Sequence, residues 1–510
     1  MADGLRLAEL LAALSLATDL GVGQPLEQAL RTCLIALELG ERLGLGRDDL
    51  ADVYYVALLR FLGCTADAHE FAELVGGDDI GLRAAIAPVA AGPPAEFASS
   101  VMPKIGAGHG PLRRAGLVLG MMRSGKEQIR DGLRAHCELG ERLAQRLGLT
   151  AGVRAGLQAA FEQWNGQGLP NGLSGEQIPL PARIVFVARD VEILHRLHGI
   201  ELTLAAVRRR RGAAYDPAIA DAVLRAGPDV LAQVETSSPW DAVLEHEPLP
   251  HPWIPEGRLD AALEAFADFV DLKSPLTPGH SREVAALAAE AAPGEAVTLR
   301  RAALVHDLGR TSVPNGIWDK PARLTEGEWE RVRLHAYYSE RILGRVQTLK
   351  PLATLAGMHH ERLDGSGYHR GSARAEIPAG ARVLAAADAY QAMTQARPHR
   401  PALAPPQAAQ ELEGMARSGR LDADAVAAVL VAAGHALRKP SRAAWPAGLS
   451  DREVEVLRLL CRGGTKKQVA SLLSISPSTV DHHVRHIYDK AGVQTRAGAT
   501  LFALEHDLLK

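Results

Sequence analysis

The sequence has few cysteines and no long apolar run, and these absences exclude several classes of protein. The 510-residue chain contains four cysteines, Cys33, Cys64, Cys137 and Cys461, and no CxxC spacing. We therefore expect neither a disulfide framework nor a thiolate zinc site. This cysteine usage predicts a protein of the reducing cytoplasm. The N-terminus lacks a basic leader followed by an apolar core, and no run of about eighteen apolar residues occurs, so we expect neither export nor a membrane span.

The sequence also lacks a strong excess of charge of either sign. The formal net charge is -3, so affinity for nucleic acid has to come from a local basic patch. A content of 47% hydrophobic and 23% charged residues is ordinary for a soluble globular protein, and the length suggests about three domains. Apolar residues recur at spacings of three and four, as in LRTCLIALELGERLGL, while alternating β-branched runs are few. These patterns predict a mainly α protein.

Two segments rich in proline and glycine divide the chain. They are EHEPLPHPWIPEG at 245–257 and RKPSRAAWPAG at 438–448, where proline would break a helix. We therefore predict domains over residues 1–240, 255–437 and 448–510, with a linker at 438–447.

The first two domains resemble each other in sequence. EQWNGQGLPNG from residue 162 matches ERLDGSGYHRG from residue 361, and LLRFLGCT from residue 58 matches LVHDLGRT from residue 304. From His136 against His335 onward the offset stays at 199 residues, whereas the earlier match has an offset of 246. The first copy therefore contains 47 extra residues before His136, and their sequence indicates no particular function. The repeat predicts two helical bundles of one architecture.

The two copies differ at the positions that could bind a metal ion. The second copy carries His280, His306, Asp307, His335, His359, His360 and Asp388, and the first copy has Gln28, Arg60, Phe61, His136, Ala160, Phe161 and Arg189 at the matching positions. Six of the seven ionisable residues are thus absent from the first copy. Because one scaffold accepts either set, we predict that the second set is functional. A metal ion would also offset the cost of burying Asp307 within the apolar stretch LVHDLGRTSVP.

Residues 255–437 resemble an HD-GYP phosphodiesterase domain. The resemblance rests on TPGHS (277–281), HDLGR (306–310), the lone His335, HHERLDGSGY (359–368) and ADAYQAMTQARPHR (387–400). It implies a helical bundle in which all seven second-copy residues named above bind divalent ions and a cyclic dinucleotide, chiefly cyclic di-GMP, is hydrolysed. His306, Asp307 and Arg310 would then be catalytic, and Arg397 and Arg400 would bind substrate.

The residue types suit this chemistry. Imidazoles and carboxylates bind iron, manganese or zinc, and two such ions can clamp a phosphodiester and activate water. Iron or manganese is expected from the resemblance, with zinc left open. The sequence departs from the family at Arg310, where lysine is usual, at His369, where the named motif has proline, and at Leu276, where some members have a glutamate for a third metal. We therefore expect two metal ions.

Residues 448–510 resemble a LuxR-type helix-turn-helix domain of four helices. Ser450 and the segment SPSTV are predicted helix starts, and the segment from Arg462 to Arg496 holds six Lys or Arg against two Asp or Glu. The resemblance implies that the helix opening near Ser478 enters the major groove of double-stranded DNA. Candidates for base contacts are Ser478, Asp481, His482 and Arg485, and candidates for phosphate contacts are Lys466, Lys467, Lys490 and Arg496.

The sequence therefore predicts a cytoplasmic transcription regulator, with the first copy as a degenerate domain that packs, dimerises or senses. We expect a homodimer, because such DNA-binding domains commonly read two half-sites. A non-catalytic nucleotide receptor is the alternative that Arg310 and His369 favour. The substrate could also be another cyclic nucleotide, such as cyclic AMP or a mixed dinucleotide, and a structural role for the histidines is a third interpretation.

Overall fold

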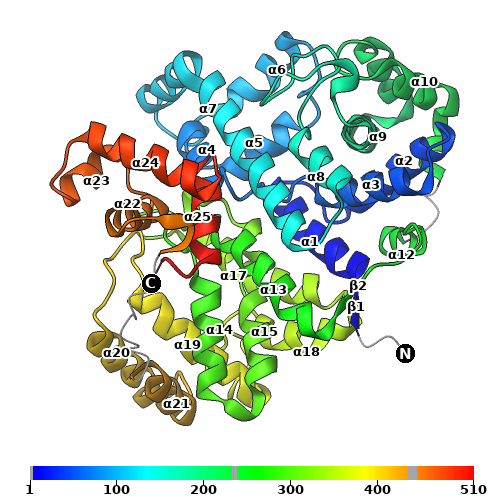
Figure 1. The fold of residues 1–510 in the computed structure, drawn as a ribbon. Coiled ribbons are helices and arrows are strands. Elements are labelled where there is room, and N and C mark those ends of the chain that lie inside the picture. Colours follow the sequence, from blue (N-terminus) through cyan, green and yellow to red (C-terminus); the bar gives the residue numbers. More distant parts are fainter. Residues whose placement is uncertain (1–3, 233, 235–237, 435–444, 510) are drawn as a thin grey trace. The chain divides into compact units, whose positions relative to one another are not determined.

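The computed structural model describes residues 4–232, 234, 238–434 and 445–509, and over these residues the protein is mainly α, as predicted. The chain divides into two compact units, Met1–Leu259 and Asp260–Lys510. In Figure 1 the first unit runs from blue to green and the second from green to red. No described helix combines the length and apolarity that crossing a membrane requires.

The first unit is built around a helix that is apolar on nearly every side. In α1 (Leu7–Gly21) the sequence LAELLAALSLATDLG buries all but two of its residues, because α2 (Gln28–Arg42), α3 (Arg47–Leu59) and α12 (Pro239–Glu245) pack around it. The unit continues through α8 (Ala151–Gln158), α9 (Leu180–Arg210) and α10 (Pro217–Ala226).

The first unit extends beyond the predicted boundary at residue 240. Strand β2 (Trp253–Pro255) pairs antiparallel with β1 (Gly4–Arg6), with Leu5 opposite Ile254. The Glu247 carboxylate accepts hydrogen bonds from the Arg6 guanidinium and the Tyr55 hydroxyl. The proline-rich segment is therefore part of this unit, because the pairing of β2 with β1 holds it there. Most of the predicted linker at 438–447 lies outside the described residues.

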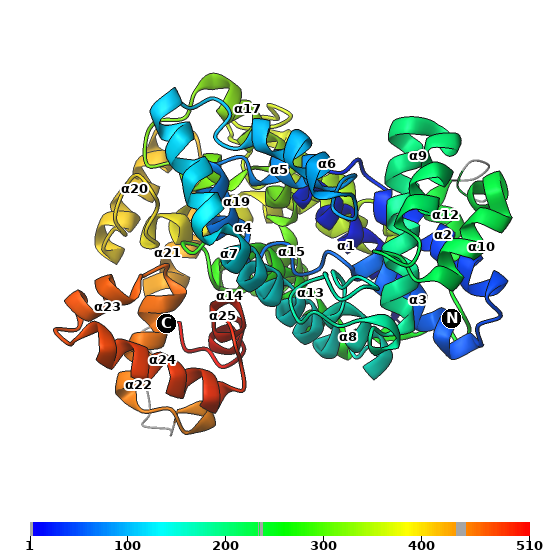
Figure 2. The same ribbon diagram turned by 90° about the horizontal axis from the view of Figure 1, so that it is seen from above.

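The additional residues of the first copy form helices of their own. These are α4 (Ala68–Val75), α5 (Asp79–Ile86), α6 (Pro94–Val101) and the first part of α7 (Pro111–Arg146), which both ribbon views show as one long helix (Figures 1 and 2). Val75, Leu82, Val89, Val101 and Ile105 make a small separate core between them. The insertion is thus a packed subdomain.

The second unit begins with a helical bundle, drawn mainly in green and yellow in Figure 1. Its helices are α13 (Glu256–Asp271), α14 (His280–Ala291), α15 (Ala296–Val305), α16 (Asn315–Trp318), α17 (Glu326–Leu343), α18 (Lys350–Gly357), α19 (Ala379–Thr394), α20 (Pro405–Arg417) and α21 (Ala423–Gly434). The closest packing joins α14 to α15 and α19, and α17 to α18 and to the short 3₁₀ turn Leu308–Ser312. The predicted metal ligands lie on these elements or directly beside their ends.

The C-terminal domain has the four predicted helices, α22 (Asp451–Cys461), α23 (Lys466–Leu472), α24 (Pro477–Ala491) and α25 (Arg496–Glu505). Ser450 caps α22 in a capping box with Glu453, and Ser476 caps α24, so both predicted helix starts are confirmed. Val456, Leu457, Val480 and Ile487 lie in its buried core.

Candidate metal centre

Seven predicted residues from different helices of the second unit meet at one buried place. His280 begins α14, His306 and Asp307 follow the end of α15, His335 lies on α17, His359 and His360 follow α18, and Asp388 lies on α19. Their nitrogen and oxygen atoms form three overlapping groups that could each hold a metal ion: His335, His359 and His360; His280, His306 and Asp388; and His306, Asp307 and His359. All seven residues belong to at least one group.

Backbone carbonyls fix the tautomers of three of these imidazoles. The Nδ1 atoms of His306, His335 and His359 each donate to a carbonyl oxygen three residues earlier, on Ala303, Val332 and Ala356 respectively. The Nε2 atom of each neutral ring is then a lone-pair donor. Such an outer hydrogen bond is a common way for proteins to orient a metal-binding histidine.

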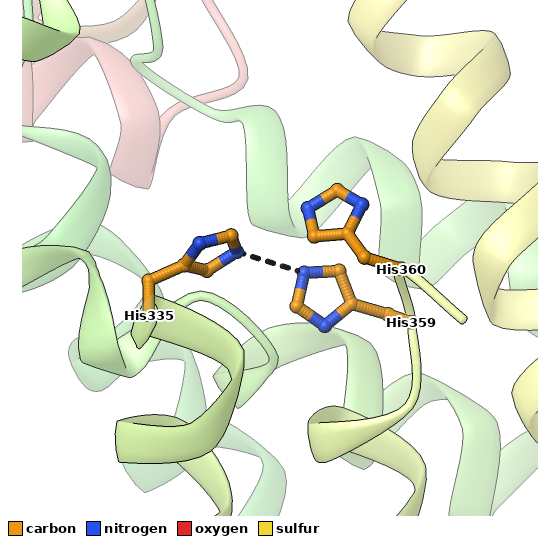
Figure 3. Close-up of side chains that lie close together, drawn as sticks. All are labelled: His335, His359 and His360. Atoms are coloured by element: carbon orange, nitrogen blue, oxygen red, sulfur yellow. Dashed lines mark hydrogen bonds between the residues drawn. The ribbon is translucent and has the colours of Figure 1, made fainter. Parts of the chain in front are cut away.

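The arrangement of the histidine rings favours a cation between them. The Nε2 atoms of His335 and His359 lie 3.2 Å apart, along the dashed line in Figure 3, and both carry lone pairs in the tautomers just described. Among the described residues, the buried Nε2 atom of His306 has no partner at hydrogen-bond distance, and its nearest carboxylate oxygens are 3.5 Å away on Asp307 and 3.7 Å away on Asp388. Facing lone pairs repel unless a proton or a metal ion lies between them. These residues therefore fit a metal ion.

Two carboxylates supply the negative charge that divalent ions need. An Asp388 oxygen lies 3.1 Å from His280 Nε2, and an Asp307 oxygen lies 3.4 Å from His335 Nε2 and 3.6 Å from His359 Nε2. Burial raises the pKa of both carboxyls, but neighbouring imidazoles, and Arg310 at Asp307, outweigh it and hold each pKa well below its usual range. Both carboxylates are therefore anionic at neutral pH, the state in which they could bind a metal ion.

The pKa values of two histidines at the site shift in opposite directions. Burial lowers the pKa of His335 to about 4, although Asp307 opposes the shift. At His306 burial also acts to lower the pKa, but Asp307 and Asp388 prevail and raise it to about 9. Without a metal ion, a proton on His306 therefore offsets one of the two carboxylate charges and Arg310 pairs with Asp307, and binding of a metal ion by His306 would displace that proton.

Gly309 allows the HD turn to approach α17. A Cβ atom at this residue would lie 2.0 Å from the carbonyl oxygen of His335, and the Gly309 amide donates to Ser339 Oγ at 2.8 Å. Any side chain here would push His306 and Asp307 away from His335. The sequence HDLGR thus contains a packing requirement beside its ionisable pair.

Gln395 is a residue of this site that the sequence reasoning missed. Its Oε1 atom lies 3.0 Å from His280 Nδ1, and its amide nitrogen donates to Glu283. Glu283 also accepts from Gln391. This arrangement orients the Gln395 carbonyl toward the ring and leaves His280 Nε2 for a metal ion. The only available signal was the position of Gln395 inside the quoted segment ADAYQAMTQARPHR.

Arg310 is held tightly by its surroundings. Its guanidinium donates to the Asp307 carboxylate at 2.9 Å and lies 4.4 Å from the centre of the Trp318 ring. The stacking on Trp318 suits a planar guanidinium better than an ammonium. Arg310 therefore positions Asp307.

The two predicted substrate-binding arginines differ. The Arg400 guanidinium donates to the backbone carbonyls of Ala392 and Met393 at the end of α19, which gives it a structural role in this state. The Arg397 side chain has no hydrogen bond or ion pair within the described part of the chain. Burial and the nearby Arg310 lower the pKa of Arg397 to about 10, so it remains a cation beside the two aspartates.

The loop after His360 also shapes the site. Tyr368 lies with its ring centre 4.6 Å from that of His360. His369, which stands where the named motif has proline, lies 3.7 Å from the Glu340 carboxylate. Glu361 organises the loop by accepting the backbone amide of Arg370 at 2.7 Å.

The corresponding place in the first unit is filled by aromatic rings. The Arg60 guanidinium lies 5.2 Å from the ring centres of both Phe161 and Phe186, and the His136 ring packs edge-on against Phe161 at 4.8 Å. His136 Nε2 is turned to the carbonyl oxygen of Arg60, 3.1 Å away. No group of metal-ligating residues was found among the described residues of this unit.

The predicted DNA contacts fall into two sets. Ser478, His482 and Arg485 are exposed on α24, and Lys466 and Lys467 are exposed at the start of α23. Asp481 pairs with both Lys466 and Arg485.

Two of the predicted phosphate contacts are less open. Lys490 donates to Glu453 at 2.7 Å and to the Gly448 carbonyl, so its ammonium ties α24 to the start of α22. Arg496 is half-buried at the start of α25.

Comparison with known proteins agrees with this architecture. The family described as "HD domain" matches residues 126–219 and 264–425, which lie in both copies, and the family described as "Bacterial regulatory proteins, luxR family" matches residues 447–503. The 3'3'-cGAMP-specific phosphodiesterase 3 of Vibrio cholerae is 32% identical over 406 residues, which cover 78% of this chain and 88% of that protein.

Other relatives match a smaller part. The cyclic di-GMP phosphodiesterase of Thermotoga maritima is 39% identical over 122 residues, which cover 24% of this chain and 33% of that protein. Among solved structures, the cyclic GMP-AMP-specific phosphodiesterase V-cGAP3 of V. cholerae superposes with a TM-score of 0.59 at 29% identity, covering 85% of this chain and 98% of that one. The chain therefore belongs to the HD-domain family, with cyclic nucleotide phosphodiesterases among its relatives, and ends in a domain of the LuxR family.

Proposed function

We propose that this protein hydrolyses a phosphodiester bond of a cyclic dinucleotide at the buried centre of its second unit. The observation that carries the proposal is the convergence of five imidazoles and two carboxylates, three of whose rings have tautomers that direct Nε2 to the centre. A buried set of this kind without thiolates suits two ions of iron or manganese, or zinc.

The seven residues named above would hold the metal ions. Bound there, such ions would polarise the phosphodiester and activate water for attack on phosphorus. The chain's own residues do the rest. Arg310 holds Asp307 in place, Gln395 fixes the tautomer of His280, and Arg397 provides a cation that can bind a phosphate oxygen.

We propose 3'3'-cGAMP as the first substrate to test, ahead of the cyclic di-GMP that the sequence motifs imply. The relative that spans both units of this chain is named for cGAMP specificity, whereas the relatives named for cyclic di-GMP match much shorter segments. The alignment over 406 residues includes the degenerate copy, so the support extends beyond the metal ligands.

The experiment is anaerobic hydrolysis by the full chain loaded with Fe(II) or Mn(II). Equal concentrations of 3'3'-cGAMP, cyclic di-GMP and cyclic AMP are supplied, and products are separated by chromatography. We expect a linear dinucleotide from cGAMP and none from the His306→Ala, Asp307→Ala variant. Product formation by that variant, or none by the wild type, would contradict the proposal.

A non-catalytic receptor is the second candidate. The observation that favours it is the enclosure of Arg310 between Asp307 and Trp318, which removes its guanidinium from ready contact with substrate. Under this alternative the loaded protein binds cGAMP in calorimetry and releases no product. The Arg310→Lys variant separates the two candidates, because gain of turnover would identify Arg310 as the cause of inactivity.

We further propose that a homodimer of the protein binds double-stranded DNA through α24 and that the nucleotide alters this binding. The support is the exposed row Ser478, His482 and Arg485 on a helix of a LuxR-family domain. The test selects bound fragments from random duplexes and measures their affinity with and without saturating cGAMP. Unchanged affinity would refute the coupling, because a ligand shifts only an equilibrium between states that it binds differently.

A further inference from the structure

Arg60 brings a positive charge into the centre of the first unit and has hydrogen-bond donors left over there. The residue is only 3% exposed, and within the described part of the chain its buried Nε and Nη1 atoms have no hydrogen-bond partner. The rings of Phe161 and Phe186, whose centres lie 5.2 Å from the guanidinium carbon, stabilise the charge. They do not replace acceptor oxygens, and a buried charged donor without an acceptor is costly. Arg60 is therefore equipped to bind an anionic ligand.

A second arginine lies beside Arg60. The guanidinium carbons of Arg60 and Arg189 lie 5.7 Å and 5.9 Å from the centre of the same ring, that of Phe61. Arg189 is 7% exposed, and its Nε atom also has no hydrogen-bond partner among the described residues. Burial, followed by the charge of Arg189, lowers the pKa of Arg60 to about 9. The two cations thus repel each other, and a nearby anion would stabilise both.

The carboxylate that acts on Arg60 is already occupied by other donors. Asp190 opposes the lowering of the Arg60 pKa. Its oxygens accept hydrogen bonds from Arg189 at 2.7 Å, from Arg210 at 3.0 Å and from the Tyr215 hydroxyl at 2.7 Å. Three buried arginines therefore share one aspartate. Their excess positive charge is what an anionic ligand would neutralise.

Two further carboxylates of this unit have partners of their own. Asp67 pairs with Arg83 at 2.7 Å, and Glu162 accepts the backbone amide of Asn171 at 2.8 Å. Within the residues that the structure describes, Arg60 forms an ion pair with neither of them. The missing negative charge of this centre is therefore not supplied by these side chains.

The second unit indicates which anion suits this place. Arg60 and Arg189 stand where the second copy has His306 and Asp388. The two arginines are 3% and 7% exposed, and the two metal-site residues are 0% and 5% exposed, so the first centre is no more closed than the second. In the second centre, metal ions would hold a phosphodiester. In the first centre, guanidinium cations occupy the matching positions.

We propose that Arg60 and Arg189 bind a phosphate group at the centre of the first unit. Guanidiniums bind phosphate through charge-assisted hydrogen bonds. No group of metal-ligating residues was found among the described residues of this unit, so the phosphate is held without a metal-activated water. The group can come from free inorganic phosphate or from a cyclic dinucleotide. The comparison with the second centre rests on the proposed function, whereas the unpartnered arginines do not.

The first test is equilibrium dialysis of the full-length protein against radiolabelled inorganic phosphate at constant ionic strength. The His306→Ala, Asp307→Ala protein is the background, so that metal ions of the second centre do not contribute. Adding Arg60→Met should weaken binding of one phosphate per chain at least about tenfold, because charge-assisted hydrogen bonds are lost. Adding Arg47→Met instead is the matched control, because Arg47 is exposed on the same helix α3, and binding should stay unchanged.

Competition separates the two sources of the phosphate group. Unlabelled 3'3'-cGAMP should displace the labelled phosphate from the background protein if the nucleotide occupies the site. If free phosphate is the ligand, cGAMP leaves the label in place. Phosphate bound by exposed lysines of the C-terminal domain is common to all these proteins, so it cancels in the difference between Arg60→Met and Arg47→Met.

A measurement on the wild type does not depend on the folding of a variant. Crystals grown with arsenate, a phosphate analogue whose arsenic scatters X-rays anomalously, should show an anomalous peak within hydrogen-bond distance of Arg60 Nε or Nη1. Arg60→Lys adds a second comparison, because lysine keeps the charge and loses the planar set of donors. Its phosphate affinity should lie between those of the background protein and Arg60→Met.

Three results would overturn the proposal. They are equal phosphate binding with and without Arg60→Met, an equal loss in Arg47→Met, and arsenate peaks that all lie away from Arg60. If Arg60→Met does not fold, the arsenate peak decides. Hydrolysis is measured separately on protein with an intact second centre. Absent hydrolysis together with phosphate binding that needs Arg60 would remove the proposed activity alone, and the reverse pattern would remove the phosphate site alone.

Discussion

The two copies share close glycine contacts and a loop hydrogen bond to a glutamate, and they differ in the side chains at their centres. A Cβ atom on Gly63 would lie 1.9 Å from the His136 carbonyl oxygen, just as one on Gly309 would lie 2.0 Å from that of His335. Glu162 accepts the backbone amide of Asn171, as Glu361 accepts that of Arg370. The fold therefore depends on glycine contacts and loop carboxylates.

The centres show how differently one scaffold can stabilise a buried space. In the second copy this space is lined by imidazoles and carboxylates that could hold a metal ion. In the first copy Arg60 supplies a fixed positive charge among phenylalanine rings, and burial lowers the pKa of Arg60 to about 9, so it stays charged at neutral pH. The described residues of the first centre offer no group of metal ligands, whereas those of the second could hold a metal ion.

The largest expected difference is in metal content and activity. His306→Ala should lower metal content and reduce hydrolysis by at least about 100-fold, since a direct ligand matters more than the outer partners that cost 10- to 100-fold. Arg60→Met, at the matching position, should leave metal content unchanged because it replaces a side chain of the metal-free copy. Elemental analysis and turnover of both variants make the comparison. Equal metal loss in the two would refute it.

Glycine substitutions should affect both copies alike. Gly63→Ala and Gly309→Ala each place a Cβ within van der Waals overlap of a backbone carbonyl, and we expect a loss of about 3 kcal/mol in the free energy of unfolding of the affected unit. Gly294→Ala is the control, because its Cβ would meet nothing within 4 Å. Denaturant unfolding measures this loss. If one alanine is tolerated and the other is not, the two copies do not depend on this glycine in the same way.

Metal removal should distinguish the copies again. Chelation should lower the melting temperature of the second unit and leave that of the first unchanged, since a ligand at about 100 times its dissociation constant contributes about 2.7 kcal/mol to the state that binds it. Calorimetry with hydrogen exchange to assign the transitions is the measurement. A His306→Ala, Asp307→Ala protein should show no response to chelator, and a response of the first unit would contradict the prediction.

A smaller effect concerns pH. Burial lowers the pKa of His136 to about 3 from its ordinary 6.5. The unfolded chain therefore takes up a proton that the folded chain refuses between these values, so the stability of the first unit should fall as pH falls from about 6.5 toward about 3, by at most about 1.4 kcal/mol per pH unit. His136→Gln should flatten this dependence in urea unfolding between about pH 7 and about pH 5. An unchanged slope would show that other groups cause it.

Much of the candidate site could be predicted because the residue types alone indicate its chemistry. His306, Asp307 and the pair His359 and His360 stand out as ionisable residues where the first copy has Arg60, Phe61, Ala160 and Phe161. The helix starts at Ser450 and Ser476 could also be predicted from the sequence, because capping depends on residues within one helical turn.

The partners of long side chains could not be predicted in the same way. Arg400 was expected to bind substrate and donates to carbonyls of α19, and Lys490 was expected to contact phosphate and pairs with Glu453. Gln395 was not expected at all and touches His280. The local sequence gives the chemical groups of a residue. It does not determine which residue far away in the chain those groups will contact.

The sequence by itself determined the helical class, the tandem repeat, the helix-turn-helix domain and the candidate ligands, because periodicity, capping and the loss of matched residues are local or internal comparisons. Only the tertiary structure decided which nitrogen of each histidine faces the centre and which arginines are already engaged. Those properties depend on contacts between segments far apart in the chain, and they exist only once the helices have packed.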